Sequence, residues 1–508
     1  MGILILRSMK YGFYVLSVLL FLNSCQKSNE NKNKFSSEID ETLILKVTKD
    51  NFINGKTFCQ LYVNTNEKLS HENGVWIDVP KNYDNQTSST DKMQIYAYTR
   101  KPFDPKLPSF VFVDGGPGQN THQFEDILSD GYNQINFDQR GVGCSTPNTW
   151  DEYSDQKIYS SKNTIYDMEE IRKHFGIEKW SVYGLSYGTI PATMYSSFFK
   201  ANTKVLVLEG VVGSVENLSR FNYFSDKWNL IIKSFNEKQK NSFDQLILND
   251  RDKKFEIIMQ QFMIAGYRDA GFKSLKENLL DKLFPLEGGF NEEAFKELKR
   301  KYTLSRTRFE KPQQPGAVDD NILSIFYCKE LKAFEKDKFT LDYDSEKGFI
   351  ERPTTLKKYW RDECYKHDIK EENQDSYEEA KYPVLVPIYY LQGSHDAATV
   401  ATGALNHWKM VPKKSVFFMF SIKGGHNPGL SKINSANDEI KLAHRNLYIK
   451  ALNGEKIDSE FVKNLNSIIT KNEKNENLKK VTWELFLKRP KDFSSIEGEL
   501  EGIKRIQY

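Results

Sequence analysis

Residues 181–189 read Ser-Val-Tyr-Gly-Leu-Ser-Tyr-Gly-Thr, a short apolar run that ends in Gly-x-Ser-x-Gly. Such a run is typical of a sharp turn from a strand into a helix, which exposes a serine hydroxyl so that a base can reach it. Glycines at 184 and 188 fit this turn, because it leaves little room for a Cβ beside the serine. Ser186 is therefore a candidate nucleophile. In a chain of this length the motif alone would arise by chance with a probability on the order of 0.1 to 0.2, so its weight depends on finding partners.

Strands and helices alternate around this turn. Nearly unbroken apolar runs, which favour strands buried on both faces of a parallel sheet, alternate with segments of helical periodicity. This order predicts a mostly parallel, doubly wound sheet with an α/β fold. The chain before it carries short β-branched and aromatic runs that predict a β-meander. The expected meander strands are 58–63, 75–79 and 94–98; the core strands are 109–113, 134–137, 180–183 and 204–212; the core helices are 164–175 and 190–199.

The alternation stops after the strand at 204–212 and resumes at 387–391 and 415–422. The intervening segment reads mainly as helices, so we expect a helical insertion between two parts of one sheet. The last eighty or so residues also have helical character. The resulting division is a signal peptide (1–24), a polar tether (25–41), the first part of the core (42–215), the insertion (216–383), and the second part of the core with a helical tail (384–508).

Two strands after the insertion supply partners for Ser186. A nucleophile on this topology takes its acid from the end of a later strand and its histidine from a loop after the next one. Asp396 follows the strand at 387–391, and His426 follows the strand at 415–422. His426 would accept the serine proton, while Asp396 would orient the imidazole. His395 is the alternative base, although neighbours in an extended chain point in opposite directions.

Charge and composition exclude other classes. Lys and Arg number 72 against 69 Asp and Glu, a net charge of +3 in 508 residues, which gives no electrostatic case for nucleic acid. No zinc-type spacing such as His-Glu-x-x-His occurs, so we expect no metal and no other cofactor.

The N-terminus predicts export. Arg7 and Lys10 precede an apolar run, residues 11–22, that is too short to span a bilayer as a mature helix. The following Leu-Asn-Ser-Cys, which ends at Cys25, resembles a bacterial lipoprotein cleavage box. We therefore expect lipid on Cys25, attachment to a bacterial membrane, and a position on its periplasmic or cell-surface side. An ordinary cleaved signal and an uncleaved anchor are the alternatives.

Four cysteines remain, an even number in a chain expected to leave the reducing cytosol. We favour pairs within one structural unit, Cys59 with Cys144 and Cys328 with Cys364. The alternative is four free buried thiols.

Three motifs together resemble the prolyl aminopeptidase and tripeptidyl aminopeptidase family of α/β-hydrolases. They are Gly-Gly-Pro-Gly at 115–118, Asp-Gln-Arg-Gly-Val-Gly-Cys-Ser at 138–145 and Gly-Leu-Ser-Tyr-Gly at 184–188. The resemblance covers roughly residues 42–215 and 384–450. It implies an α/β-hydrolase core with a helical cap, and a serine peptidase that removes one or a few residues from peptide N-termini.

The resemblance also assigns residues. It gives the nucleophile to Ser186, the acid to Asp396 and the base to His426, and it implies backbone N–H groups of Gly116 and Tyr187 as oxyanion donors. Family members bind the substrate amine with glutamates near the sixth strand and in the cap. Two glutamates lie in about that region, although their spacing matches poorly and structural roles are the alternative; they are Glu209 and Glu216.

Two departures qualify this assignment. Asp114 stands where the family often has His, and Gly-Leu-Ser-Tyr-Gly replaces the Gly-Gly-Ser-Trp-Gly usual in prolyl aminopeptidases, which favours the tripeptidyl branch. The expected function is thus an exported serine aminopeptidase acting through an acyl-enzyme on peptides with a free N-terminus. The alternatives are an esterase with the same triad and, from another class, a non-catalytic surface lipoprotein that binds a ligand.

Overall fold

The structure is a computed structural model. It describes residues 47–63, 73–84, 91–123, 126–128, 131–213, 234–250, 254, 256–309, 318–331, 340–344, 348–352, 364, 377–396, 398–412, 415–433 and 435–487. The predicted signal peptide, Cys25 and the tether lie outside these residues.

Nine strands form one twisted sheet that is parallel through its centre. The sheet order is β1-β2-β4-β3-β5-β6-β9-β10-β11. Pairing is parallel from β4 to β10 and antiparallel at both edges. This is the predicted doubly wound α/β fold with a meander at its start. The strands are β1 (Gly74–Pro80), β2 (Lys92–Tyr98), β3 (Ser109–Val113), β4 (Asn133–Phe137), β5 (Trp180–Leu185), β6 (Thr203–Glu209), β9 (Ile388–Gly393), β10 (Val416–Ser421) and β11 (Trp483–Phe486).

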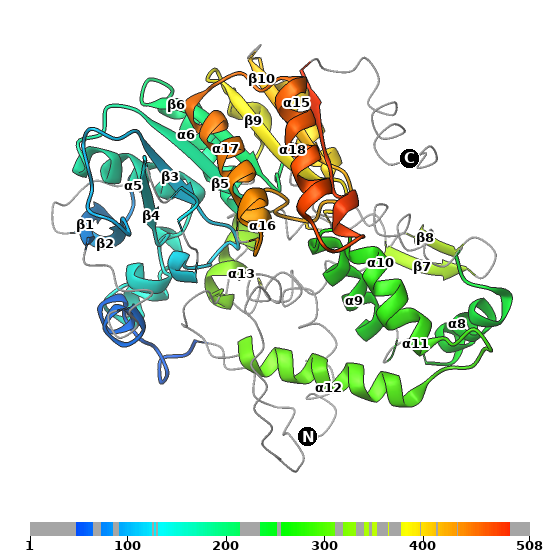
Figure 1. The fold of residues 1–508 in the computed structure, drawn as a ribbon. Helices are drawn as coiled ribbons and strands as arrows, with labels where there is room; N and C mark the ends of the chain where they lie inside the picture. Colours follow the sequence, from blue (N-terminus) through cyan, green and yellow to red (C-terminus); the bar gives the residue numbers. More distant parts are fainter. Residues whose placement is uncertain are drawn as a thin grey trace.

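Helices cover both faces of this sheet (Figure 1). Successive side chains of a strand point to opposite faces, so Val182 of β5 joins one apolar core and Tyr183 joins the other. The first core also contains residues of α5 (Ser161–His174), α6 (Thr189–Phe198) and α15 (Ala401–Met410). The second contains residues of α17 (Asp438–Asn453) and α18 (Ser459–Asn472). Burial on both faces explains why the central strands are apolar throughout.

The insertion leaves the core after β6 and returns before β9. Part of it has its own apolar core, which includes Phe243, Ile258 and Leu283. By contrast, the last long helix, α13, packs its Ile322 and Phe326 into the main core. The described elements are α8 (Glu237–Asp250), α9 (Glu256–Tyr267), α10 (Gly271–Leu275), α11 (Asp281–Leu283), α12 (Glu292–Phe309), α13 (Asp320–Lys329) and a hairpin of β7 (Thr340–Asp344) and β8 (Gly348–Arg352).

The strand predicted at 58–63 is wrong. This segment is helical, with α3 (Gly55–Phe58) followed by a π-helical turn at Cys59–Val63. Asn54 caps α3 by accepting a hydrogen bond from the backbone N–H of Thr57 at 2.9 Å. The composition of this segment favoured a strand. The spacing of its buried apolar residues, however, suits one side of a helix.

Two disulfides join Cys59 to Cys144 and Cys328 to Cys364, the pairs favoured from the sequence. The first ties the N-terminal segment to the loop after β4. The second ties α13 to a later part of the insertion.

The chain after α18 contains a strand that the sequence did not predict. β11 pairs antiparallel with β10 at the sheet edge. Among the described residues, no helix combines the length and apolarity needed to cross a bilayer.

Candidate active site

Ser186 lies at the turn between β5 and α6. Its φ is +56°, a left-handed conformation that is uncommon for a residue with a side chain and is typical of a nucleophile held on a tight turn. Both flanking glycines are required sterically. A Cβ on Gly184 would lie 2.6 Å from the carbonyl oxygen of Gly188, and one on Gly188 would lie 2.1 Å from that of Val113.

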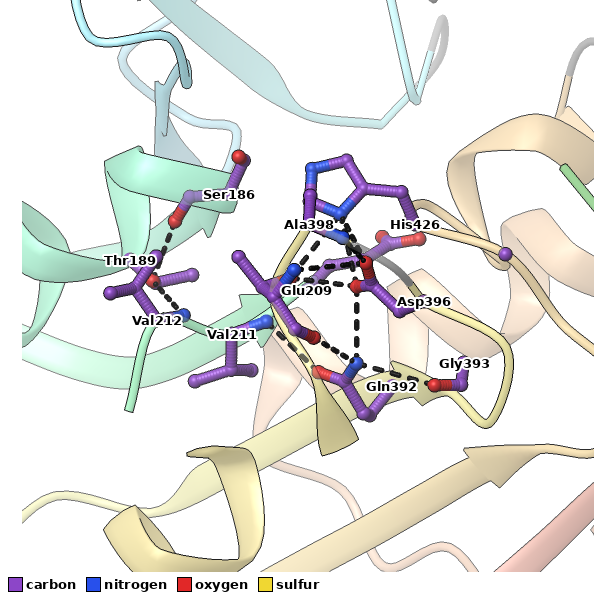
Figure 2. A network of polar contacts seen from close by, with 12 residues as sticks. Ser186, Thr189, Glu209, Val211, Val212, Gln392, Gly393, Asp396, Ala398 and His426 are labelled. Atoms are coloured by element: carbon purple, nitrogen blue, oxygen red, sulfur yellow. Dashed lines mark hydrogen bonds and ion pairs between the residues drawn. The ribbon is translucent and has the colours of Figure 1, made fainter. Parts of the chain in front are cut away.

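His426 and Asp396 meet beside this turn, as Figure 2 shows. Nδ1 of His426 lies 2.9 Å from Oδ2 and 3.0 Å from Oδ1 of Asp396. Both side chains are almost fully buried. The opposite side of the imidazole and the Ser186 hydroxyl point toward one another (Figure 2). The loops after β5, β9 and β10 thus bring the three predicted side chains to one end of the sheet.

Asp396 is held by donors that the sequence analysis missed. Its Oδ2 accepts from the Thr399 hydroxyl at 2.6 Å and from Nε2 of Gln392 at 3.1 Å. Its Oδ1 accepts from the backbone N–H of Ala398 and Thr399 at 2.9 and 3.0 Å. An Asp side chain often accepts from the backbone N–H two residues later, as Asp396 does from Ala398, so a local turn here could have been expected from the sequence. These bonds fix the carboxylate that faces the imidazole.

His395, the alternative base, lies in a different environment. Its ring makes an edge contact with Phe272 of α10, at 4.9 Å between ring centroids. Its backbone N–H donates to the carbonyl oxygen of Gly424 at 2.9 Å. His395 therefore helps to join the two loops, while His426 carries the contact with Asp396.

The glycine loop after β3 lies directly against the nucleophile. A Cβ on Gly115 would come within 2.8 Å of Cβ and 3.3 Å of Oγ of Ser186, so only glycine permits this approach. Gly116 follows with a φ of +107°. The assignment of the backbone N–H groups of Gly116 and Tyr187 as oxyanion donors stays a prediction.

A buried carboxyl anchors the start of this loop. Asp114 accepts a hydrogen bond from the backbone N–H of Gly115 at 2.6 Å, and burial raises its pKa well above the ordinary value. Nε2 of Gln139 donates to the backbone oxygen of Asp114 at 2.9 Å. Gln139 belongs to the second motif of the resemblance, so one function of that motif is to support the glycine loop.

Asp138, from the same motif, pairs with His122 at 2.6 Å between Oδ2 and Nε2. Burial opposes its ionisation, but His122 and the backbone N–H groups of Thr121 and Cys144 lower its pKa. In the described part of the chain, the one His, Cys, Asp or Glu cluster with metal-ligand spacing is His122, Asp138 and Cys144. Cys144 is bonded to Cys59, which removes the thiolate that would bind a metal.

Arg140 completes the motif with a buried ion pair. Its Nε and Nη2 donate to the two carboxylate oxygens of Asp167 at 2.6 and 2.7 Å. Nη2 also donates to the backbone oxygen of Pro80 at 2.7 Å. This bidentate contact connects α5 to the strand β1 and to the loop after β4.

Glu209 does not face a substrate. Its side chain is fully buried, and burial raises its pKa despite several donors. The sequence-based suggestion that Glu209 binds a substrate amine is therefore not supported, because protein donors occupy both oxygens. These donors are the hydroxyls of Tyr183 and Tyr448 and the backbone N–H groups of Gly429 and Leu430. Glu209 instead holds the segment after His426. Glu216 lies outside the described residues.

The side chain of Tyr187 extends away from the nucleophile toward the insertion. Its hydroxyl lies 2.6 Å from Oγ of Ser161, which in turn donates to Glu330 at the end of α13. Glu330 also accepts from the backbone N–H of Ser161 at 2.6 Å. The nucleophile turn is therefore connected to the insertion through buried hydrogen bonds.

Comparison with known proteins agrees with this fold. Residues 108–252 match the family described as "alpha/beta hydrolase fold". The proline iminopeptidase of Xanthomonas citri is 33% identical over 112 residues, 21% of this chain and 34% of the relative. That of Arabidopsis thaliana is 35% identical over 103 residues, 20% of this chain and 26% of the relative.

The solved structure of a proline iminopeptidase from Mycobacterium smegmatis aligns with 74% of this chain and 99% of its own. Its identity is 11% and its TM-score is 0.37. The chain spans about a third of the length of the curated relatives that it matches. The fold is that of an α/β-hydrolase. The predicted resemblance to the prolyl aminopeptidase family is confirmed over the fifth of the chain that these relatives match.

Proposed function

We propose that this protein is an exported, lipid-anchored serine aminopeptidase that releases one or a few residues from peptide N-termini. The observation that carries the proposal is the placement of Ser186 on a strained turn, facing an imidazole whose Nδ1 is paired with Asp396. This arrangement suits acyl transfer by a serine nucleophile.

In the proposed first step, His426 takes the Ser186 proton as Oγ bonds to the carbonyl carbon of the scissile amide. The negative charge that develops on the carbonyl oxygen is stabilised by the backbone N–H groups of Gly116 and Tyr187. The C–N bond then breaks, and His426 returns the proton to the departing amine. Water repeats the sequence on the acyl-enzyme and regenerates the free hydroxyl.

The aminopeptidase assignment rests on relatives that are named proline iminopeptidases and that match only part of this chain. Whether one residue or three are released depends on the insertion, and the Leu-Ser-Tyr core of the motif favours the tripeptidyl branch. Export rests on the N-terminal sequence and is supported by two disulfides, which persist in an oxidising compartment.

A fluorophosphonate probe tests the chemistry. We expect labelling of the wild-type protein at Ser186 and none in Ser186→Ala with an unchanged melting temperature. Failure of the folded wild-type protein to react would contradict the proposal and favour a ligand-binding lipoprotein.

Substrates with free and blocked N-termini test the exopeptidase assignment. We expect hydrolysis of prolyl or tripeptidyl amides with a free amine and loss of hydrolysis after acetylation of that amine. Equal rates for the two, with faster turnover of simple esters, would indicate the esterase alternative.

The membrane anchor has a separate test. Metabolic labelling with a radioactive fatty acid is expected in the full-length protein and not in Cys25→Ser. Release of unmodified protein into the soluble fraction from wild-type cells would contradict the anchor and leave the enzymatic proposal intact.

A further inference from the structure

The insertion contacts the loop that carries His426. The contact is made by residues 267–270, the corner between α9 and α10. Oδ1 of Asp269 accepts from the backbone N–H of Gly425 at 2.8 Å. Its Oδ2 lies 2.9 Å from Nζ of Lys432 and 3.2 Å from the hydroxyl of Ser431. One carboxylate thus binds the chain on both sides of His426.

The same corner contacts the histidine itself. The backbone N–H of His426 donates to the carbonyl oxygen of Tyr267 at 3.1 Å. The two rings meet edge to face, with centroids 5.0 Å apart. Tyr267 therefore limits how far the imidazole can shift.

Two residues at this contact, Ala270 and Lys423, have strained backbone conformations. The N–H of Ala270 donates to the carbonyl oxygen of Lys423 at 2.8 Å, and both residues have left-handed φ values, +53° and +57°. Such conformations cost of the order of 1 kcal/mol or more and persist only where the surroundings determine them. The histidine loop and the insertion corner thus hold each other in conformations that neither sequence favours.

A second contact involves the glycine loop. The backbone N–H of Asp319, immediately before α13, donates to the carbonyl oxygen of Gly118 at 2.9 Å, and Gln119 forms an isolated antiparallel bridge with Val318. The Asp319 carboxylate caps α13 and accepts from the Tyr153 hydroxyl at 2.7 and 2.8 Å. The start of α13 is thereby fixed to the core while it holds the glycine loop.

We propose that Asp269 and Asp319 are positioning residues, Asp269 for the loop of the catalytic base and Asp319 for the oxyanion loop. This inference rests on the proposed serine-hydrolase function. It assigns the insertion a role in the chemical step, in addition to any control of substrate entry. The physical reason is that catalytic groups must be held within about 0.5 Å of their productive geometry, and a misplacement of about 1 Å can cost about 100-fold in rate.

The test compares Asp269→Ala with the matched control Asp281→Asn. Asp281 also pairs with a lysine, but both Lys276 and its other partner Gln239 lie within the insertion. Because removal of Asp269 leaves the buried Lys432 without its partner, the pair Asp269→Asn with Lys432→Gln is measured as well. That double variant removes both charges and keeps polar side chains of similar size.

Two readouts are needed. The first is the maximal rate of labelling by a small fluorophosphonate, which reacts at Ser186 in the core and needs no contact with the insertion. We expect a 10- to 100-fold loss in both Asp269 variants and no change in Asp281→Asn, with circular dichroism and melting curves establishing that each is folded. The second is hydrogen exchange of the amides at 423–430, which we expect to accelerate only in the Asp269 variants.

The outcomes separate the two proposals. Unchanged labelling with a raised KM for peptides would overturn the inference and leave the insertion as a lid. Absence of labelling in the wild type, with faster exchange in the Asp269 variants, would overturn the proposed function and retain the positioning of the loop. For Asp319→Ala we expect reduced labelling with normal exchange at 423–430; normal labelling in the folded variant would overturn its assignment.

Discussion

The core sheet and the insertion contribute to the active site in different ways. Ser186, Asp396 and His426 all come from loops that follow core strands, and a parallel sheet brings the carboxyl ends of its strands to one edge. Asp269 and Asp319 come from the insertion. Asp269 contacts the loop of His426, and Asp319 contacts the glycine loop after β3. The sheet thus decides which side chains meet, while the insertion restrains the loops that surround them.

Asp396→Asn tests the core contribution and has the largest expected effect. The amide would keep the volume but would favour the wrong imidazole tautomer and lose the charge that stabilises the protonated form. We expect kcat to fall about 10⁴-fold in peptide hydrolysis. Asp438→Asn, which removes the charge of a side chain that is 97% exposed, is the control and should retain full activity. A loss below tenfold would mean that Asp396 does not serve His426.

Asp167→Asn tests how much the buried ion pair of Arg140 and Asp167 contributes to the stability of the core. It leaves the Arg140 guanidinium buried without its counter-charge. We expect the free energy of unfolding, measured in urea, to fall by about 3 to 5 kcal/mol. Asp84→Asn breaks an exposed pair with Lys162 and should cost less than about 1 kcal/mol. Equal costs would show that burial of the first pair contributes nothing.

Replacement of both Cys328 and Cys364 by serine tests the insertion. The disulfide closes a loop with a sequence separation of 36, so its loss should reduce the free energy of unfolding by about 3 to 4 kcal/mol. Thiol titration of the denatured wild-type domain should detect no free thiol among the four cysteines before reduction and four afterwards. Four reactive thiols without reductant would contradict both bridges.

The raised pKa of Asp319 predicts a smaller effect, a dependence of the free energy of unfolding on pH. Burial raises its pKa to about 6 from an ordinary value of 3.8. Between these values the native state holds a proton that the unfolded state has released, so stability falls as pH rises from about 4 to about 6 and is level above that. Relative to Asp319→Asn, the wild-type protein should lose about 2 to 3 kcal/mol of unfolding free energy across this range. A difference that is independent of pH would contradict the shifted pKa.

Local signals in the sequence were sufficient for much of the fold. Apolar runs at the central strands reflect burial on both faces, and Gly-x-Ser-x-Gly reflects a turn that Gly184 and Gly188 alone allow. The segment at 58–63 was misassigned because its composition suits a strand. The Asn54 cap and the burial of one side of the segment favour a helix instead. β11 was missed because its pairing with β10 depends on a partner distant in sequence.

The sequence by itself determined the order of the central strands and helices and the choice of Ser186, Asp396 and His426, because strand-end loops of a parallel sheet share one edge. The tertiary structure decided what surrounds them. Glu209 had the residue type of an amine ligand, yet its burial and its tyrosine partners assign it to the loop after His426. Asp269 and Asp319 carried no motif, since their contacts join segments that only folding brings together.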